Sequence, residues 1–206
     1  MHFLSPDSKF YSFMSKVADL MTLSLLWLLF SIPVFTVGSA NVALYYSVHK
    51  VVRKEEGKPV RTFWQAFWSN FREGSRLLGI FFFCVVLIGF LGISLYRSAG
   101  SAALTEIYIL CVILGSFCVA WFHYGFCYVA IFTSPFLAVL KNSFLICLAN
   151  LPMSITMTVI FFILWGLFLL HLPVSAIGLI LLPGTYCWLS SLMMDRVWKK
   201  YISQKE

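Results

Sequence analysis

Two long apolar runs, at 75–96 and 104–131, are joined by a short segment of small residues at 98–103. Each run is long enough to cross the hydrocarbon core of a bilayer as a helix, which takes roughly 20 apolar residues. A connection this short places the two helices antiparallel, as a hairpin. Within hydrocarbon the backbone N–H and C=O groups need partners, and a helix provides them inside one segment. The sequence therefore predicts an all-α membrane protein.

Composition extends this prediction to the rest of the chain. Of 206 residues, 61% are hydrophobic and only 11% are charged, whereas soluble domains have about 25% charged residues. The length fits one membrane-embedded domain, 1–206, a polytopic bundle of five or six transmembrane helices at roughly 20 residues each. Further spans are predicted at 10–32, 152–170 and 174–194. We expect no soluble catalytic domain.

A break in the first apolar region decides the number of crossings. Pro33 and Gly38 both oppose a continuous helix. If the chain reverses at 33–38, residues 39–54 form a short second crossing, and the bundle has six. If the chain only kinks there, the bundle has five.

Positive charge orients the bundle, because Lys and Arg concentrate in cytoplasmic loops. Seven of the fifteen Lys and Arg residues lie between Lys50 and Arg76, four lie beyond Asp195, and Lys141 lies between these groups. Even numbers of predicted crossings separate the three regions, so all of them can be cytoplasmic together. Six crossings also place the N-terminus in the cytoplasm and are favoured for that reason. The C-terminus is expected to be cytoplasmic.

The segment 61–73 predicts a short amphipathic helix on the cytoplasmic membrane surface. Thr62 and Gln65 have the spacing of a capping box, which predicts that the helix begins there. Tryptophan settles at headgroup depth and arginine pairs with lipid phosphate, so this helix suits a bilayer surface or a docking partner. The alternative is an ordinary core helix. The aromatic face, spaced as one helical face, consists of Phe63, Trp64, Phe67, Trp68 and Phe71.

Polar side chains within the predicted spans are costly in hydrocarbon, so each needs a partner or a cavity. Two sets approach the same side of the bundle, one on the short second helix and one near the end of the span at 104–131. They can line a small cytoplasm-facing cavity whose hydrogen-bonding and aromatic groups suit a sugar. The alternative is hydrogen bonding between helices and an interfacial tyrosine belt. The candidates are Asn41, Tyr45, Tyr46, His49, His123 and Tyr124.

Sequence patterns that carry catalytic or metal chemistry are absent. The chain has no paired nucleophile and base, no phosphate-binding glycine loop and no cluster with metal spacing. We therefore predict no catalytic residue, no metal site and no cofactor, and we do not expect an enzyme. The six cysteines lie in or against apolar runs without a CxxC pair, which is typical of small buried hydrophobic residues. The basic loops are expected to contact anionic lipid headgroups, and nucleic acid is not an expected partner.

A faint internal repeat indicates a duplicated unit at about 39–97 and 104–170. In each unit a crossing is followed by a short cytoplasmic amphipathic helix and a further crossing. Both units have the same orientation, unlike the inverted repeats of many transporters. The residues that match at a shift of 72 are Thr62 with Ser134, Ala66 with Ala138, and Asn70 with Asn142.

Four stretches of the chain carry a family resemblance. Residues 25–39 read LLWLLFSIPVFTVGS, residues 43–46 read ALYY, the aromatic helix follows at 63–71, and Leu182-Pro183 lies in a closing span with a basic tail. In these features the chain resembles the YesL-like family of bacterial integral membrane proteins, over essentially its whole length. Asn41 departs from the pattern, since a smaller or hydroxyl residue is expected there.

The function that this resemblance implies is a role in sugar uptake or sensing at the bacterial cell membrane. Family members are commonly encoded beside carbohydrate ABC transporters, sugar-processing enzymes and two-component regulators. We therefore expect a multi-pass accessory component that docks an ABC permease or a sensor kinase through its cytoplasmic surface helices. The alternative is a transporter or facilitator for a small polar solute such as a sugar.

Overall fold

The computed structural model describes residues 9–99, 104–170 and 175–202, and within these ranges the chain is helical without a strand. The all-α prediction is therefore confirmed for this part of the chain. Two short elements, the 3-10 helix η1 (Val34–Thr36) and the π-helix η2 (Val48–Arg53), flank the second helix. The α-helices are α1 (Lys9–Phe30), α2 (Val37–Ser47), α3 (Pro59–Ser69), α4 (Phe71–Ala99), α5 (Leu104–Ile131), α6 (Phe136–Ala149), α7 (Leu151–Leu170) and α8 (Ser175–Ile202).

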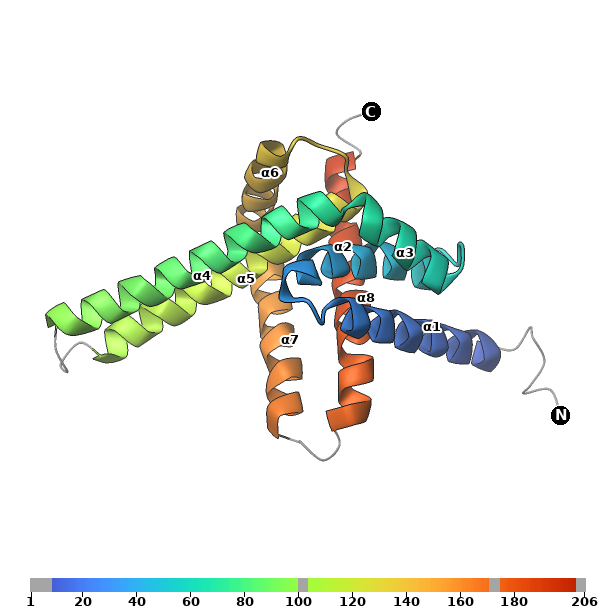
Figure 1. Cartoon of the computed structure of the whole chain (residues 1–206), viewed down its shortest axis with the longest axis horizontal. Helices are drawn as coiled ribbons and strands as arrows, with labels where there is room; N and C mark the ends of the chain where they lie inside the picture. The colour runs from blue at the N-terminus through green and yellow to red at the C-terminus, as the bar shows by residue number, and fades with distance from the viewer. Residues whose placement is uncertain (1–8, 100–103, 171–174, 203–206) are drawn as a thin grey trace.

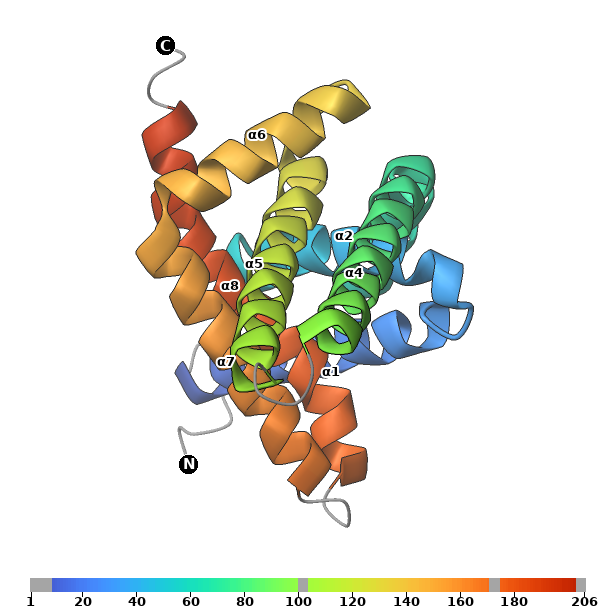
Figure 2. The same cartoon turned by 90° about the vertical axis from the view of Figure 1, so that its left-hand side faces the viewer.

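Two antiparallel hairpins and a group of three helices make up the fold (Figure 1). Helices α4 and α5 lie side by side as the first hairpin, and α7 and α8 form the second, which points in a different direction. Helices α1, α2 and α3 pack together on the far side of the junction, and α6 lies across one end of α5 (Figure 2). All three parts meet at the centre of the molecule.

Several helices are long and apolar enough to cross a membrane. Within the residues that the structure describes, three qualify singly by length and composition, and the pair α6 and α7, bent by 96°, provides a fourth candidate if it counts as one span. These segments agree with the predicted spans at 10–32, 75–96 and 104–131, and they indicate a membrane protein. The three single segments are Phe10–Phe30, Phe71–Arg97 and Thr105–Ile131.

The break in the first apolar region is a reversal and not a kink, but α2 and η2, which follow it, are not among the candidate membrane spans, so six crossings are not confirmed. Trp27 Nε1 donates to Asn41 Oδ1 at 2.8 Å, and Lys16 pairs with Glu55 at 2.8 Å, so α2 and η2 run back along α1. The hydrogen bond from Lys16 lowers the pKa of the exposed Glu55 carboxyl. Thr36 stabilises the turn, since its hydroxyl donates a hydrogen bond to the carbonyl oxygen of Phe30 at 2.5 Å.

The tip of this reversal packs closely against the start of α4. A Cβ added to Gly38 would lie 2.1 Å from the carbonyl oxygen of Gly74, and one added to Gly74 would lie 2.7 Å from Ser39 Cα. Only residues without a Cβ allow two backbones to approach this far. The contact sets α2 directly against the first turn of α4.

A second close contact joins the first and last helices. Ser24 Oγ accepts a hydrogen bond from the backbone N–H of Gly184 at 2.9 Å, next to Pro183 inside α8. A Cβ at Gly184 would lie 2.5 Å from that hydroxyl oxygen. The buried hydroxyl thus connects α1 to α8 at the point where the α8 backbone approaches α1 closely.

Two asparagine corners lead from a short helix into a long one. Asn70 joins α3 to α4, and Asn150 joins α6 to α7. In each, the side-chain Nδ2 donates to the carbonyl four residues earlier, at 3.0 Å for Asn70 and 2.9 Å for Asn150. The two corners place Asn70 and Asn150 at equivalent positions. The residue paired with Asn70 by the sequence repeat, Asn142, instead lies within α6 and donates to Tyr128.

Candidate functional site

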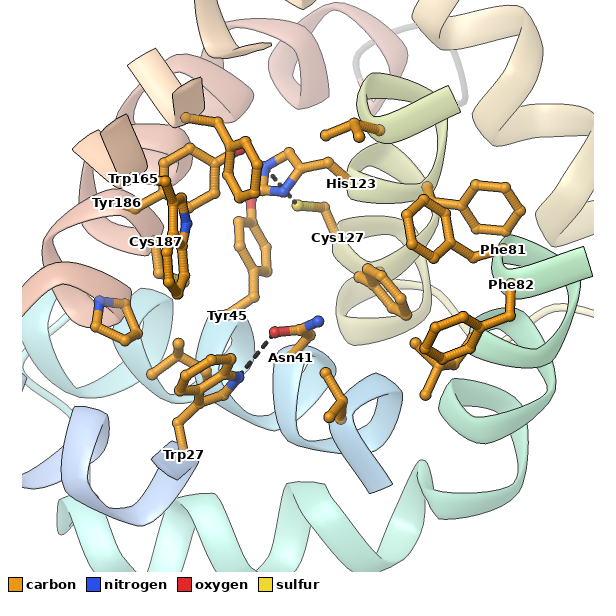
Figure 3. Close-up of a pocket in the computed structure, with 18 residues that line it drawn as sticks. Trp27, Asn41, Tyr45, Phe81, Phe82, His123, Cys127, Trp165, Tyr186 and Cys187 are labelled. Carbon is orange, nitrogen blue, oxygen red and sulfur yellow. Dashed lines mark hydrogen bonds between the residues drawn. The ribbon is translucent and has the colours of Figure 1, made fainter. Parts of the chain in front are cut away.

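A cavity of about 280 Å³ lies where α1, α2, α4, α5, α7 and α8 meet (Figure 3). Phe, Tyr and Trp supply nine of its eighteen lining residues, and most of the others are aliphatic or cysteine. The cavity is partly open, since Phe82 at its edge keeps 46% of its surface exposed. It is therefore a mainly aromatic space at the junction of six helices.

Asn41 supplies an amide to the cavity wall. Its Oδ1 accepts the hydrogen bond from Trp27, as an indole N–H can only donate. This fixes the orientation of the amide and turns its NH₂ group away from Trp27 toward the open space (Figure 3). Asn41 thus presents two N–H donors from α2.

His123 brings a second polar group from α5. Its Nε2 lies 3.6 Å from Cys127 Sγ, one helical turn further along, and its ring meets that of Tyr186 edge-on, with centroids 5.2 Å apart. Tyr186 comes from α8, so this contact joins two helices across the wall. The imidazole is held between a thiol and an aromatic ring.

Tyr45 links the cavity wall to the end of α8. Its ring is almost fully buried, and its hydroxyl accepts the indole N–H of Trp198 at 3.2 Å. Trp198 lies well beyond the cavity on α8, so this hydrogen bond joins the wall to that end of the helix.

The structure brings three of the six predicted cavity residues together and leaves three outside the lining. Asn41, Tyr45 and His123 line the cavity. Tyr46 faces the other way, with the Lys50 ammonium 5.7 Å from its ring centroid. Tyr124 is fully buried in the hydrophobic core. His49, the last of the three, lies in a separate polar cluster beyond Tyr45.

This polar cluster connects η2 to α8 outside the candidate membrane spans. Arg53 Nη1 lies 2.5 Å from Asp195 Oδ2 and also donates to the carbonyl of Ser191 at 2.8 Å. His49 Nδ1 lies 3.6 Å from the other Asp195 oxygen. Burial lowers the pKa of His49, Asp195 opposes that shift, and Lys54 and Arg53 add to it. The cluster anchors the π-helix to α8.

Sequence reasoning missed the cavity residues on α1, α7 and α8. Trp27 lies in a Leu-rich run, and its only signal is an indole N–H that needs an acceptor in hydrocarbon. Trp165 and Tyr186 lie on helices apolar enough to be taken for lipid-facing. Their position depends on how the two hairpins cross, which the periodicity of a single helix does not contain.

The predicted aromatic face of α3 is divided between core and surface. Phe63 and Phe67 are buried against Phe30 of α1, with ring centroids 5.7 and 4.8 Å away. Trp64 and Trp68 keep 51% and 55% of their surface exposed. The fifth member of the face, Phe71, is partly buried and stacks on Trp68.

The predicted capping box at Thr62 and Gln65 is wrong. Helix α3 begins three residues earlier, at Pro59, with Lys58 as the N-cap residue. Proline favours the first helical position because its ring presets φ and its missing N–H has no helical partner there. Thr62 is instead buried inside the helix.

Potential metal ligands do not gather into a cluster in the described part of the chain. No group of three or more His, Cys, Asp or Glu side chains there is placed to hold a metal ion. All six cysteines are free thiols, four of them buried. The arrangement suits binding by shape, aromatic contact and a few hydrogen bonds.

The fold and cavity define an all-helical protein with several candidate membrane spans and an aromatic site between them. A family model described as "Protein of unknown function, DUF624" matches residues 20–91, which run from the middle of α1 through most of α4. This match is consistent with the resemblance to the YesL-like family and names no activity. No curated protein and no solved structure matches the chain.

Proposed function

We propose that this chain is a small-molecule-binding integral membrane protein whose ligand occupies the central cavity. The observation that carries the proposal is the convergence of six helices on one aromatic space that holds Asn41 and His123. Ligand sites are typically concave and mostly apolar with a few placed polar groups, in volumes of about 300–1,000 Å³. A cavity of about 280 Å³ suits a small ligand.

A cavity-filling substitution tests this proposal. Val119 lines the cavity from α5, and Val119→Phe adds a ring where the ligand would lie. We expect a small molecule to co-purify with the wild type and to be lost from this variant, measured by mass spectrometry of denatured extracts. The matched control is Val86→Phe, which changes an exposed valine on α4. A molecule recovered equally from all three proteins would lie outside the cavity and contradict the proposal.

The cellular role we propose is that of an accessory component in a bacterial carbohydrate uptake or sensing system. The family resemblance and the exposed Trp64 and Trp68 of α3 support a docking role. The two indoles keep 51% and 55% of their surface exposed, although Trp64 also meets the Phe30 ring in a T-shaped contact with centroids 5.5 Å apart. The partner would be an ABC permease or a sensor kinase. A facilitator for a small polar solute is the alternative proposal, and solute flux in liposomes distinguishes it from a docking role.

The docking role predicts that Trp64→Ala with Trp68→Ala releases the partner without unfolding the chain. Phe63 and Phe67 still bury against α1, so α3 stays in place. We expect co-purified permease or kinase to fall at least tenfold, measured by quantitative mass spectrometry after mild-detergent purification from the native host. Trp188→Ala removes an indole that is 36% exposed on α8 and serves as the control. Unchanged partner recovery in the double variant would rule out docking through α3.

A further inference from the structure

The charge of the cavity walls restricts what the cavity can hold. Among the described residues, none that lines it is Asp, Glu, Lys or Arg. An ion that enters an apolar space loses its hydration and needs an opposite charge in return. These walls offer none, so a neutral ligand fits them best.

The polar atoms of the walls are few, and several of them already have partners. Tyr45 Oη accepts from Trp198 at 3.2 Å, and His123 Nε2 lies 3.6 Å from Cys127 Sγ. A free sugar carries hydroxyl groups all around its ring, and each hydroxyl without a partner loses a hydrogen bond that water had provided. The aromatic walls can stack on one face of a sugar ring. They cannot provide hydrogen-bond partners for the hydroxyl groups around the edge of that ring. A mainly apolar ligand suits the cavity better.

Asn41 selects one feature of such a ligand. Its oxygen is held by Trp27 at 2.8 Å, so the NH₂ group is the part of the amide that faces the cavity (Figure 3). An amide NH₂ donates hydrogen bonds and does not accept them. Within a mostly apolar space it therefore favours a ligand that carries an acceptor oxygen.

Resting on the proposed function, we propose that the cavity binds a neutral, mainly apolar molecule that carries a hydrogen-bond acceptor and that the Asn41 amide recognises this acceptor. The rest of the ligand lies among the aromatic side chains of α4, α5 and α7. A neutral lipid of the bilayer and a free aromatic carbonyl compound share this chemistry.

Four fluorinated probes of matched size test the ligand class by ¹⁹F NMR on the purified full chain in detergent. They are 4-fluoroacetophenone, 1-ethyl-4-fluorobenzene without the acceptor, charged 4-fluorobenzoate, and 2-deoxy-2-fluoroglucose. Circular dichroism first shows that Val119→Phe is folded. The signals measured with this variant are then subtracted from those of the wild type, which removes the contribution of probe that partitions into micelles. We expect 4-fluoroacetophenone to bind the wild type at least about fivefold more tightly than 1-ethyl-4-fluorobenzene. This is the ratio of affinities that one additional hydrogen bond is expected to give.

Asn41→Leu identifies the group that recognises the acceptor. We expect the preference for 4-fluoroacetophenone over 1-ethyl-4-fluorobenzene to disappear in this variant while both probes still bind. An unchanged preference overturns the role of Asn41. The wild-type preference does not depend on Asn41→Leu, so its absence overturns the ligand class even if that variant fails to fold.

Other outcomes separate this inference from the proposed function. Tighter binding of 4-fluorobenzoate or fluoroglucose, lost in Val119→Phe, overturns the ligand class and leaves the proposed binding function standing. Binding of none of the probes also overturns the ligand class, and the extracts of wild type and Val119→Phe then decide whether the proposed function falls with it. In those extracts a neutral lipid or a free carbonyl compound supports the class and identifies the source, whereas an anionic molecule overturns it.

Discussion

Gly38→Ala is expected to destabilise the protein by about 3 kcal/mol, at the upper end of the cost of overpacking a close contact. The added methyl group would lie 2.1 Å from the Gly74 carbonyl oxygen and 2.8 Å from Leu78 Cβ. Neither the backbone of α4 nor that of α2 can turn aside as a side chain can, so the two helices must separate. The measurement is the free energy of unfolding in detergent micelles, by titration with a denaturing detergent.

Gly79→Ala provides the matched control for this prediction. A Cβ at Gly79 meets nothing within 4 Å, although the residue lies on the same helix as Gly74. Replacing glycine by alanine within a helix usually adds stability, by about 0.5–1 kcal/mol, because alanine loses less backbone entropy on folding. The changes in the free energy of unfolding caused by Gly38→Ala and Gly79→Ala should therefore have opposite signs. Equal stability of both would mean that α2 and α4 do not cross at Gly38.

Asp195→Asn is expected to cost about 2 kcal/mol, less than the roughly 3–5 kcal/mol measured for breaking fully buried ion pairs. The reason for the smaller value is that the Arg53 and Asp195 side chains keep 20% and 25% of their surface exposed. The Arg53 guanidinium would keep its hydrogen bond to the Ser191 carbonyl but lose the carboxylate charge. Chemical unfolding in micelles measures the loss, and limited proteolysis near η2 reports where the structure loosens.

The control is a more exposed ion pair on the same protein. Glu73 and Arg76 pair at 3.2 Å on α4, with 34% and 45% of their side-chain surface exposed. Exposed pairs contribute about 0–1 kcal/mol, so Glu73→Gln should have little effect. If the two substitutions cost the same, the cluster of Arg53 and Asp195 does not anchor η2 to α8.

The helices could be predicted from the sequence because each apolar run has its own signal. The runs at 75–96 and 104–131 needed only length and hydropathy, and the hairpin between them followed from the short connection. The reversal near Pro33 was left open, since a kink and a turn share the same residues. It was decided by partners far along the chain, Asn41 for Trp27 and Glu55 for Lys16.

The cavity could be predicted only in part, for geometric reasons. Asn41 and Tyr45 lie one turn apart on one face of α2, and that face turned out to border the cavity. His49 continues the same face by one more turn, which carries it past the cavity to Asp195. Helical spacing identifies a face but not where along it the neighbouring helices open a space. The same limit applies to α3, where helical spacing could not show that Phe63 is buried and Trp64 exposed.

The hydrogen bond between Ser24 and Gly184 joins residues 160 positions apart, and this separation matters for how the protein is made. During translation α1 enters the membrane long before the ribosome reaches α8. Contacts between distant segments form late, because the whole intervening chain must be present and ordered first. Two walls of the cavity come from these two helices, Trp27 from α1 and Tyr186 from α8. The cavity is therefore completed only after α8 has been synthesised, and a chain that stops short of α8 lacks one of its walls.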